Sequence, residues 1–345
     1  MTLRPRVLLV VPIRNAMKYL PATVESFIAA VKHYGNAELV LVDNGSTDGT
    51  WERLLAKYSA QARILRLAPA IISAVRNHGA AAAECDFLSF IDADCLIAPD
   101  YFDQAMAFFN EAKVDVSGSR HELPEKPNWI EETWEGLLPP SKEGTVLYIP
   151  SGNFMLRQEA FEAVGGFNEA LVTGEDAEIC QRLRHAGYSV VSSSRIRAVH
   201  LGNPQDLAQF FRKEVWHGLG MFGTFRWREW DKPVMMTVVH LLACAGALMN
   251  LAWGPGGWEK RMLISLLLTT IAPAASVAYR YAVSGCVYRP LRSLFLYHLY
   301  LAARVFALLE IVMQGILPAR QKEMTAKSVE SAVGRDSEPI PESRK

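Results

Sequence analysis

The chain has 345 residues with 36 basic and 36 acidic side chains, so its formal net charge is zero. This balance gives no strong sign of nucleic-acid binding, and no nucleic-acid partner is expected. Half of the residues are hydrophobic. They are unevenly placed: residues 1–230 resemble an ordinary α/β domain, whereas residues 233–318 are far more apolar.

The first residues and the cysteines indicate a reducing compartment. The apolar run that starts at Val7 ends at Pro12, which is too short for the core of a secretory signal, and none is expected. The five cysteines form no CxxC pair and have no metal-ligand spacing. We expect all of them to be reduced, packed thiols. They are Cys85, Cys95, Cys180, Cys244 and Cys286.

Strands and helices are expected to alternate over the first hundred residues. Apolar runs predict strands at 6–12, 38–43, 63–67 and 87–91, with helices at 20–31, after residue 50, and at 71–83. This alternation predicts an α/β fold with a mostly parallel sheet and helices on both faces. No G-x-G-x-x-G follows the first strand and no G-x-x-x-x-G-K occurs, which disfavours dinucleotide oxidoreductases and P-loop enzymes.

Acidic residues follow two of these strands. Asp92 and Asp94 come directly after the apolar run 87–91, and burying them would be costly, so we expect them just past the strand's carboxyl end. Two carboxylates there suit Mg²⁺ or Mn²⁺; the alternative is a polar turn before a helix starting near Pro99. Asp43 ends the second strand, either as a turn-former or as an acceptor of hydrogen bonds from a nucleotide base.

The later half of the domain offers a candidate base. Residues 120–145 are polar and are expected to form a flexible loop. Thr173 and Asp176 fit a capping box with Asp176 at the third helical position, and Asp176 also fits a general base at a helix N-terminus. His200 ends a short predicted strand; it is either structural or a ligand facing a metal.

Six motifs, in this order, resemble those of the inverting family 2 glycosyltransferases of the GT-A fold. The resemblance covers about residues 6–225, and the specificity comes from the set of motifs and its order. The motifs are Pro12-Ile13-Arg14-Asn15, residues 42–50, residues 74–79, Asp92-Ala93-Asp94, Gly165-Gly166-Phe167 and Gly174-Glu175-Asp176.

The resemblance implies a nucleoside diphosphate sugar donor, with UDP or GDP as the nucleotide. Pro12, Asn15 and Asp43 would lie at the donor's base, Arg76 at the base or phosphates, and Asp92 by the ribose.

The resemblance also implies the catalytic roles. Asp94 and His200 would hold Mg²⁺ or Mn²⁺, and Asp176 would deprotonate an acceptor hydroxyl that attacks with inversion. Glu175 and Trp216 are candidates for the acceptor side.

Two departures from the family's pattern affect these expectations. Residues 69–72 replace a frequent Asn-x-Gly of the donor loop. In residues 211–218 only Trp216 remains of the Gln-x-x-Arg-Trp motif of processive synthases, which favours transfer of one sugar over polymer extension.

The apolar third predicts membrane attachment. Residues 233–253 and 262–279 carry no charge and are long enough to span a bilayer. Residues 293–317 contain Arg304 and Glu310, and predict either a third span or a helix on the membrane surface. Basic residues before the first span place the domain of residues 1–225 on the cytoplasmic face of a cell inner membrane. Residues 226–318 form the membrane region, and residues 319–345 are expected to be disordered.

A domain fused to membrane helices suggests a lipid or lipid-linked acceptor in cell-envelope glycan biosynthesis. The alternative is a non-catalytic nucleotide-sugar-binding subunit of a membrane glycan-assembly complex; retention of Asp94 and Asp176 disfavours it. A transporter is disfavoured because two or three spans are few for a transport core.

Overall fold

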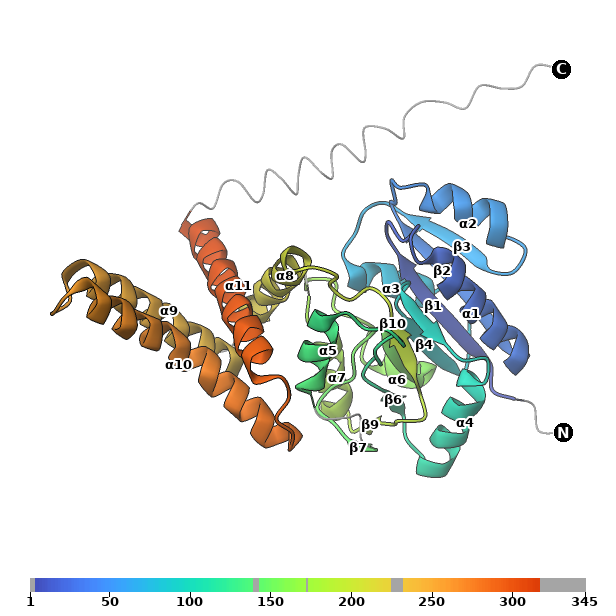
Figure 1. The fold of residues 1–345 in the computed structure, drawn as a ribbon. Coiled ribbons are helices and arrows are strands. Elements are labelled where there is room, and N and C mark those ends of the chain that lie inside the picture. Colours follow the sequence, from blue (N-terminus) through green and yellow to red (C-terminus); the bar gives the residue numbers. More distant parts are fainter. Residues whose placement is uncertain (1–3, 139–142, 172, 225–231, 317–345) are drawn as a thin grey trace, which may run out of the picture.

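The computed structural model describes residues 4–138, 143–171, 173–224 and 232–316. An eight-stranded sheet forms the centre of the part up to residue 224, here called the α/β domain (Figure 1). Its strand order is β3-β2-β1-β4-β8-β6-β9-β7, and the first four are parallel. β6 and β9 are also parallel, whereas β8 runs antiparallel to both of its neighbours and β7 runs antiparallel to β9. The predicted α/β fold with a mostly parallel sheet is confirmed. The strands are β1 Val7–Ile13, β2 Ala37–Asn44, β3 Arg63–Leu67, β4 Phe87–Ile91, β6 Val116–Gly118, β7 Gly144–Thr145, β8 Asn153–Arg157 and β9 Val190–Ser192.

Helices cover both faces of this sheet. Successive residues of a strand point to opposite faces, and in β1 Leu9 joins one core while Leu8 and Val10 join the other. Both cores exclude water, which explains why the strand is apolar throughout rather than alternating. The helices of the domain are α1 Leu20–Tyr34, α2 Thr50–Tyr58, α3 Ile72–Ala80, α4 Tyr101–Ala112, α5 Trp129–Gly136, α6 Gln158–Ala163, α7 Glu175–His185 and α8 Leu207–Thr224.

A second, two-stranded sheet lies at the end of β4. β5 (Cys95–Ile97) pairs antiparallel with β10 (Ala198–His200), and the register sets His200 opposite Cys95. Two segments about a hundred residues apart in sequence are thereby joined next to Asp94. The sequence analysis did not predict β5, because a three-residue strand shows too little periodicity.

Three expectations were wrong. The predicted loop 120–145 contains α5, whose capping box joins Asn128 and Glu131. The capping box predicted before α7 is not formed: the helix follows Gly174 in the left-handed region (φ 83°), so Asp176 is its second residue and no side chain caps it. All five cysteines are free, but Cys286 is exposed rather than packed, because it lies in the turn after an apolar helix.

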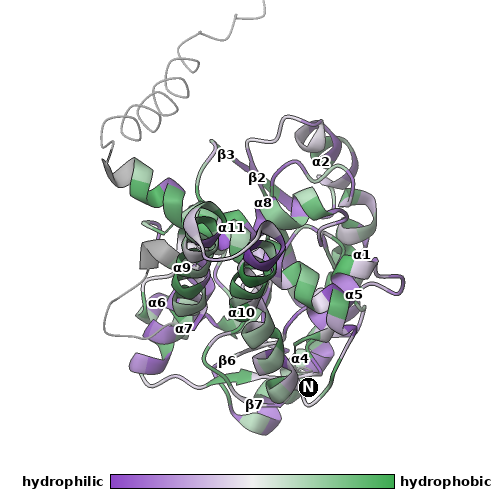
Figure 2. Ribbon diagram, turned by 60° about the vertical axis from the view of Figure 1, so that its left-hand side comes forward, coloured by the Kyte–Doolittle hydropathy of each residue, from purple (hydrophilic) through white to green (hydrophobic). Residues whose placement is uncertain are grey.

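Three apolar helices follow the domain, and each is long and apolar enough to cross a membrane. They are α9 Lys232–Trp253, α10 Trp258–Ser284 and α11 Pro290–Ile316. α9 and α10 form a hairpin that projects away from the α/β domain, and α11 lies between this hairpin and α8 (Figure 1). Figure 2 shows these helices as largely hydrophobic. The predicted boundary near residue 225 and the predicted disordered tail lie outside the described residues.

Gly118→Ala tests the packing of the central sheet. A Cβ at Gly118 in β6 would overlap the backbone oxygen of Asn153 in β8, and backbone cannot move aside as a side chain does. Overpacking of this kind costs about 1–3 kcal/mol, so we expect the thermal unfolding midpoint in detergent to fall by roughly 2–10 °C. Gly246→Ala is the control, since nothing lies within 4 Å of a Cβ there. Equal midpoints for both variants would contradict the packing.

Candidate active site

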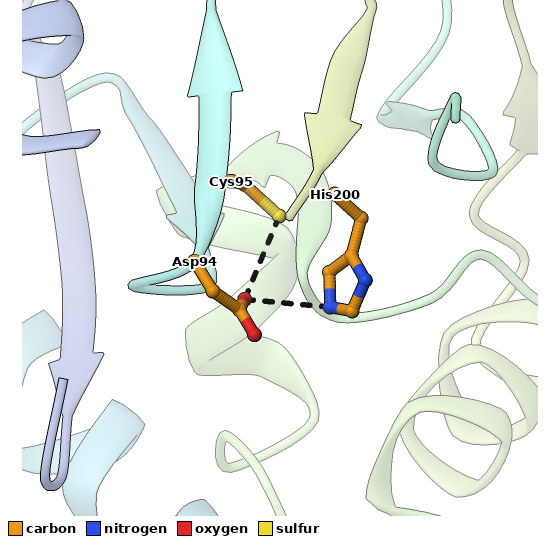
Figure 3. Close-up of side chains that lie close together, drawn as sticks. All are labelled: Asp94, Cys95 and His200. Atoms are coloured by element: carbon orange, nitrogen blue, oxygen red, sulfur yellow. Dashed lines mark hydrogen bonds and ion pairs between the residues drawn. The ribbon is translucent and has the colours of Figure 1, made fainter. Parts of the chain in front are cut away.

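Asp94 and His200 meet at the carboxyl end of β4. Asp94 Oδ1 lies 3.4 Å from His200 Nε2, and Figure 3 shows Cys95 beside them. One ligand atom from each of the three side chains lies within 4.8 Å of the other two. Gly202 backs this group, and a Cβ there would overlap the Asp94 carboxylate. The cluster therefore depends on the β5–β10 pairing and on a glycine two residues after His200.

The chemistry of this cluster fits a hard divalent cation held by two of its three members. Burial tends to raise the pKa of Asp94, but the hydrogen bond and charge of His200 outweigh it and hold the pKa below its usual value. The pKa of His200 is raised: burial acts to lower it, and Asp94 prevails. Burial raises the pKa of the Cys95 thiol well above its usual value, so that sulfur stays protonated and is a poor ligand. A carboxylate oxygen and an imidazole nitrogen suit Mn²⁺ or Mg²⁺.

A buried arginine joins this edge of the sheet to α7. The Arg76 guanidinium is 3% exposed, and it donates to Asp92 at 2.8 Å and to Glu175 at 2.7 Å. Ser151 donates a further hydrogen bond to Glu175 at 3.0 Å. An ionic chain thus runs from Asp92, two residues from Asp94, to the first turn of α7.

Asp176 follows Glu175, the last member of the ionic chain. Its side chain is partly buried, and its Oδ1 accepts the backbone N–H of Ala177. Burial and then the negative charge of Glu175 raise the pKa of Asp176 to about 6. A carboxylate with this pKa is ionised at neutral pH yet accepts a proton more readily than an ordinary aspartate, as a general base requires.

The predicted nucleotide end lies at the β1 and β2 strand ends. Asp43 is fully buried, and its Oδ2 accepts the Ser46 N–H at 3.2 Å. Its Oδ1 has no hydrogen-bond partner within the described part of the chain, although a buried carboxylate oxygen needs one. Asn15 joins the two strand-end loops by accepting the Thr47 N–H at 2.8 Å. Pro12 is buried within β1.

The comparison with family models decides the family. The model of glycosyl transferase family 2 matches residues 8–165, and that of glycosyl transferase family group 2 matches residues 87–308. The second match alone covers more than half of the chain. The chain belongs to the family 2 glycosyltransferases.

Two curated relatives of this glycosyltransferase come from bacteria. The succinoglycan biosynthesis protein ExoA of Rhizobium meliloti is 29% identical, over 56% of this chain and 62% of its own length. A pre-mycofactocin glycosyltransferase of Mycobacterium tuberculosis is 27% identical, over 60% of this chain and 46% of its own length. The chain thus aligns with less than two thirds of either relative.

A solved structure has the same fold. The mannosyltransferase PcManGT from Pyrobaculum calidifontis, in complex with GDP-Man and Mn²⁺, superposes with a TM-score of 0.56. The superposition covers 88% of this chain and 87% of that one at 19% sequence identity. It confirms the GT-A fold predicted for the glycosyltransferase.

Glu175 and Trp216 have different surroundings from each other. Glu175 is buried, and its Oε1 accepts bonds from Arg76 and Ser151, which assigns it to the ionic chain. Trp216 on α8 is 45% exposed beside His217, so it is free to meet a ligand. The acceptor-side roles of both, and donor contact by Arg76, stay predictions.

Sequence reasoning missed two neighbours of the Asp94–His200 pair in this glycosyltransferase. His121, from the segment predicted to be a loop, has its ring centroid 5.0 Å from that of His200, and its Nε2 has no partner within the described residues. Lys213 on α8 is near enough for its positive charge to act on the pKa of His200. His121 lies three residues after the end of β6, a strand of three residues that gave little signal in the sequence, and Lys213 had no local signal.

Gly202→Ala tests the geometry of the predicted metal site. The added Cβ would displace the Asp94 carboxylate, so we expect Mn²⁺ affinity in the presence of UDP or GDP to fall about 10–100-fold. Titration followed by the electron paramagnetic resonance of free Mn²⁺ measures it. Gly257→Ala, at a position with open space around it, is the matched control. Unchanged Mn²⁺ affinity in Gly202→Ala would rule out Asp94, in the position described here, as a ligand of the metal.

Proposed function

We propose that the chain transfers a single sugar from a nucleoside diphosphate sugar to a hydroxyl acceptor, with a divalent cation and with inversion at the anomeric carbon. The observation that carries this proposal is the ionic chain at the carboxyl ends of the strands. It runs from Asp92 through Arg76 to Glu175. Asp94, which pairs with His200, is two residues from its first member, and Asp176 directly follows its last. One end suits a metal-bound diphosphate and the other a general base. The family membership and the names of the relatives support the same reaction class.

Asp176 has the environment that the proposed chemistry needs. In the proposed step, its carboxylate takes the proton of the acceptor hydroxyl while that oxygen bonds to the anomeric carbon. The bond from that carbon to the diphosphate oxygen breaks, and the diphosphate leaves with the electron pair. Attack opposite the leaving group inverts the configuration. Glu175 is tied to Arg76 and to Ser151, which leaves Asp176 as the free acid of the pair.

Asp94 and His200 would hold the cation. When bound, a divalent cation neutralises the charge that develops on the leaving diphosphate. The residues' own contribution is to present one carboxylate oxygen and one imidazole nitrogen at fixed positions. Asn203 helps by lying 2.8 Å from His200 Nδ1, which orients the ring.

The donor's base is proposed to lie at Asp43. Its unpartnered Oδ1 is ready to accept a hydrogen bond, and both uracil and guanine carry N–H donors. Pro12 and Asn15 form the neighbouring walls. The acceptor is proposed to be lipid-linked, because the α/β domain is attached to apolar helices that would hold it at the cytoplasmic face of a membrane.

A donor panel tests the reaction class. Purified protein in detergent, with Mn²⁺ or Mg²⁺, should slowly hydrolyse one UDP- or GDP-sugar and release the nucleotide. We expect Asp94→Ala to abolish this release. Asp176→Asn should lower it about 10²–10⁴-fold while nucleotide binding is retained. A different outcome would support a non-catalytic nucleotide-sugar-binding subunit. In that case the protein would bind a nucleotide with the same affinity in the wild type and in Asp176→Asn, and would show no turnover even when lipid acceptors are supplied.

The pH dependence tests the base. The carboxylate form of Asp176 is the active one, and its pKa is raised to about 6. At saturating metal and donor, the rate should therefore be level above pH 7 and fall toward tenfold per unit below pH 6. Nucleotide affinity measured over the same range separates this effect from titration at the metal cluster. A rate that stays level down to pH 4 would assign the proton transfer to another group.

A further inference from the structure

We propose that α11 does not cross the membrane but lies along its surface, between the bilayer and the α/β domain, so that the chain crosses twice. The proposal rests on the membrane attachment inferred above, and it assigns a lipid surface to one exposed face of α11. It follows from what α11 packs against, what its free face carries, and how little of it extends beyond the domain.

The inner face of α11 is bound to helices of the α/β domain. Arg304 donates to Glu214 of α8 at 2.7 Å, and both side chains are buried. Three residues further along α11, Ala307 packs against Gly218 of α8, where a Cβ would approach it to 2.7 Å. The missing side chain at Gly218 lets the two helices approach closely.

The first turns of α11 are bound to α5. Arg289, just before the helix, forms an ion pair with Glu132 of α5 at 2.9 Å, and the Tyr288 hydroxyl donates to the same carboxylate at 2.5 Å. The rings of Tyr297 and Tyr300 pack against Trp134 of α5. Contacts with the domain therefore run from residue 288 to residue 307.

Neither supporting helix belongs in hydrocarbon. α5 carries Glu131, Glu132 and Glu135, and α8 carries Lys213 next to the His200 cluster, where a soluble nucleotide sugar would bind. A charged side chain at the bilayer centre costs at least about 2.5–3.5 kcal/mol. The stretch of α11 that packs on these helices is therefore held at or above the membrane surface.

Too little of α11 remains to cross a bilayer. The sequence after α11 carries Arg320, Lys322 and Glu323, so its apolar stretch ends close to residue 316. Beyond Ala307, the described part of the helix runs from Leu308 to Ile316. At 1.5 Å per residue, these nine residues span about 13 Å, against a hydrocarbon core of about 30 Å. By contrast, the 22 residues of α9 span about 33 Å.

The outer face of α11 is apolar and exposed. Five large side chains share it, and at 3.6 residues per turn they fall within an arc of about 60°. This arc, here called the outer stripe, lies opposite Leu296, Arg304 and Ala307, which are buried. It consists of Leu291 (83% exposed), Phe295 (50%), Phe306 (53%), Leu309 (47%) and Met313 (62%). Phe306 is at the edge of the stripe, where its ring also contacts Phe211 of α8 with the centroids 6.1 Å apart.

The position of the α9–α10 hairpin indicates that a lipid surface covers the outer stripe. Its near end is fixed beside α11, where Arg280 of α10 donates to the Tyr297 hydroxyl at 2.8 Å. Its far end carries Trp253 and Trp258, 82% and 63% exposed, as expected at a membrane–water boundary. A bilayer that receives this hairpin begins where α11 lies, so the outer stripe meets it at shallow depth (Figures 1 and 2).

Topology mapping of the full chain gives the first test. Cys286, the one exposed cysteine of the five, should react with a membrane-impermeant maleimide from the side of the α/β domain. Gly257→Cys in a Cys286→Ser background should react from the other side only, and a reporter fused after Lys345 should lie on the domain's side. A reporter on the side opposite the domain would overturn the proposal. Reaction of Gly257→Cys from the domain's side would instead refute the membrane hairpin itself.

Depth measurement gives the second test and has an internal control. Single nitroxides replace each residue of the outer stripe, in proteoliposomes and in the Cys286→Ser background, and relaxation by oxygen and by a nickel chelate reports depth. We expect similar shallow depths, about 5–10 Å, at all five positions. Leu266 and Ile271 of α10 should lie deep. Two results would overturn the proposal. A depth that rises to a maximum along the stripe and falls again would show that α11 spans the membrane. Dipolar broadening between chains would show that a second copy of the protein covers the stripe.

Discussion

The buried guanidinium of Arg76 is the interaction on which the rest of the site depends. It lies between Asp92 after β4 and Glu175 at the start of α7, two segments that no backbone pairing connects. The charges of Arg76 and Glu175 are buried as a pair, and Asp92, whose side chain is 33% exposed, is the second acceptor for the guanidinium. Removal of one partner from a buried pair typically costs about 3–5 kcal/mol. The cost of breaking this ionic chain fixes the position of the segment after β4 relative to the start of α7, and therefore the position of Asp94 relative to Asp176.

The same ionic chain explains why the first two acids of α7, Glu175 and Asp176, have different surroundings. Glu175 faces inward and is neutralised by Arg76, so its charge is held in place whatever binds. Asp176 follows it, gains no cation of its own, and has a raised pKa because it is partly buried beside that fixed negative charge. A structural acid thus raises the pKa of the neighbouring acid that is proposed as the general base, and neighbouring charges are a common cause of perturbed pKa values.

The parts of this molecule that could be predicted from the sequence are those fixed by local pattern. Strands buried on both faces read as unbroken apolar runs, and β1, β2, β3 and β4 lie close to where those runs placed them. The acids at their ends followed from the cost of burying charge. The packing partners did not follow: nothing local shows that Arg76 would bind two carboxylates, or that His121 would lie beside His200.

The failures have particular causes. β5 has three residues, and only its pairing with β10 makes it a strand. α5 was hidden in a polar segment because its apolar face is narrow, though Asn128 followed three residues later by Glu131 was a readable capping signal. The capping box before α7 failed because Gly174, with its positive φ, already turns the chain into the helix.

One element, α8, connects the site to the membrane region. On successive positions it carries Lys213, whose charge reaches the His200 cluster, and Glu214, which is buried against Arg304 of α11. These two side chains point about 100° apart around the helix, so α8 is a shared wall between the two regions. If α11 lies on the bilayer as proposed, α8 and α11 together separate the Asp94–His200 pair from the lipid, which is about 20–24 Å at 10–12 Å per helix. The lipid-linked acceptor proposed above, anchored in the bilayer by its tail, would need a head group long enough to cover this distance, and α8 would form the wall along which it extends.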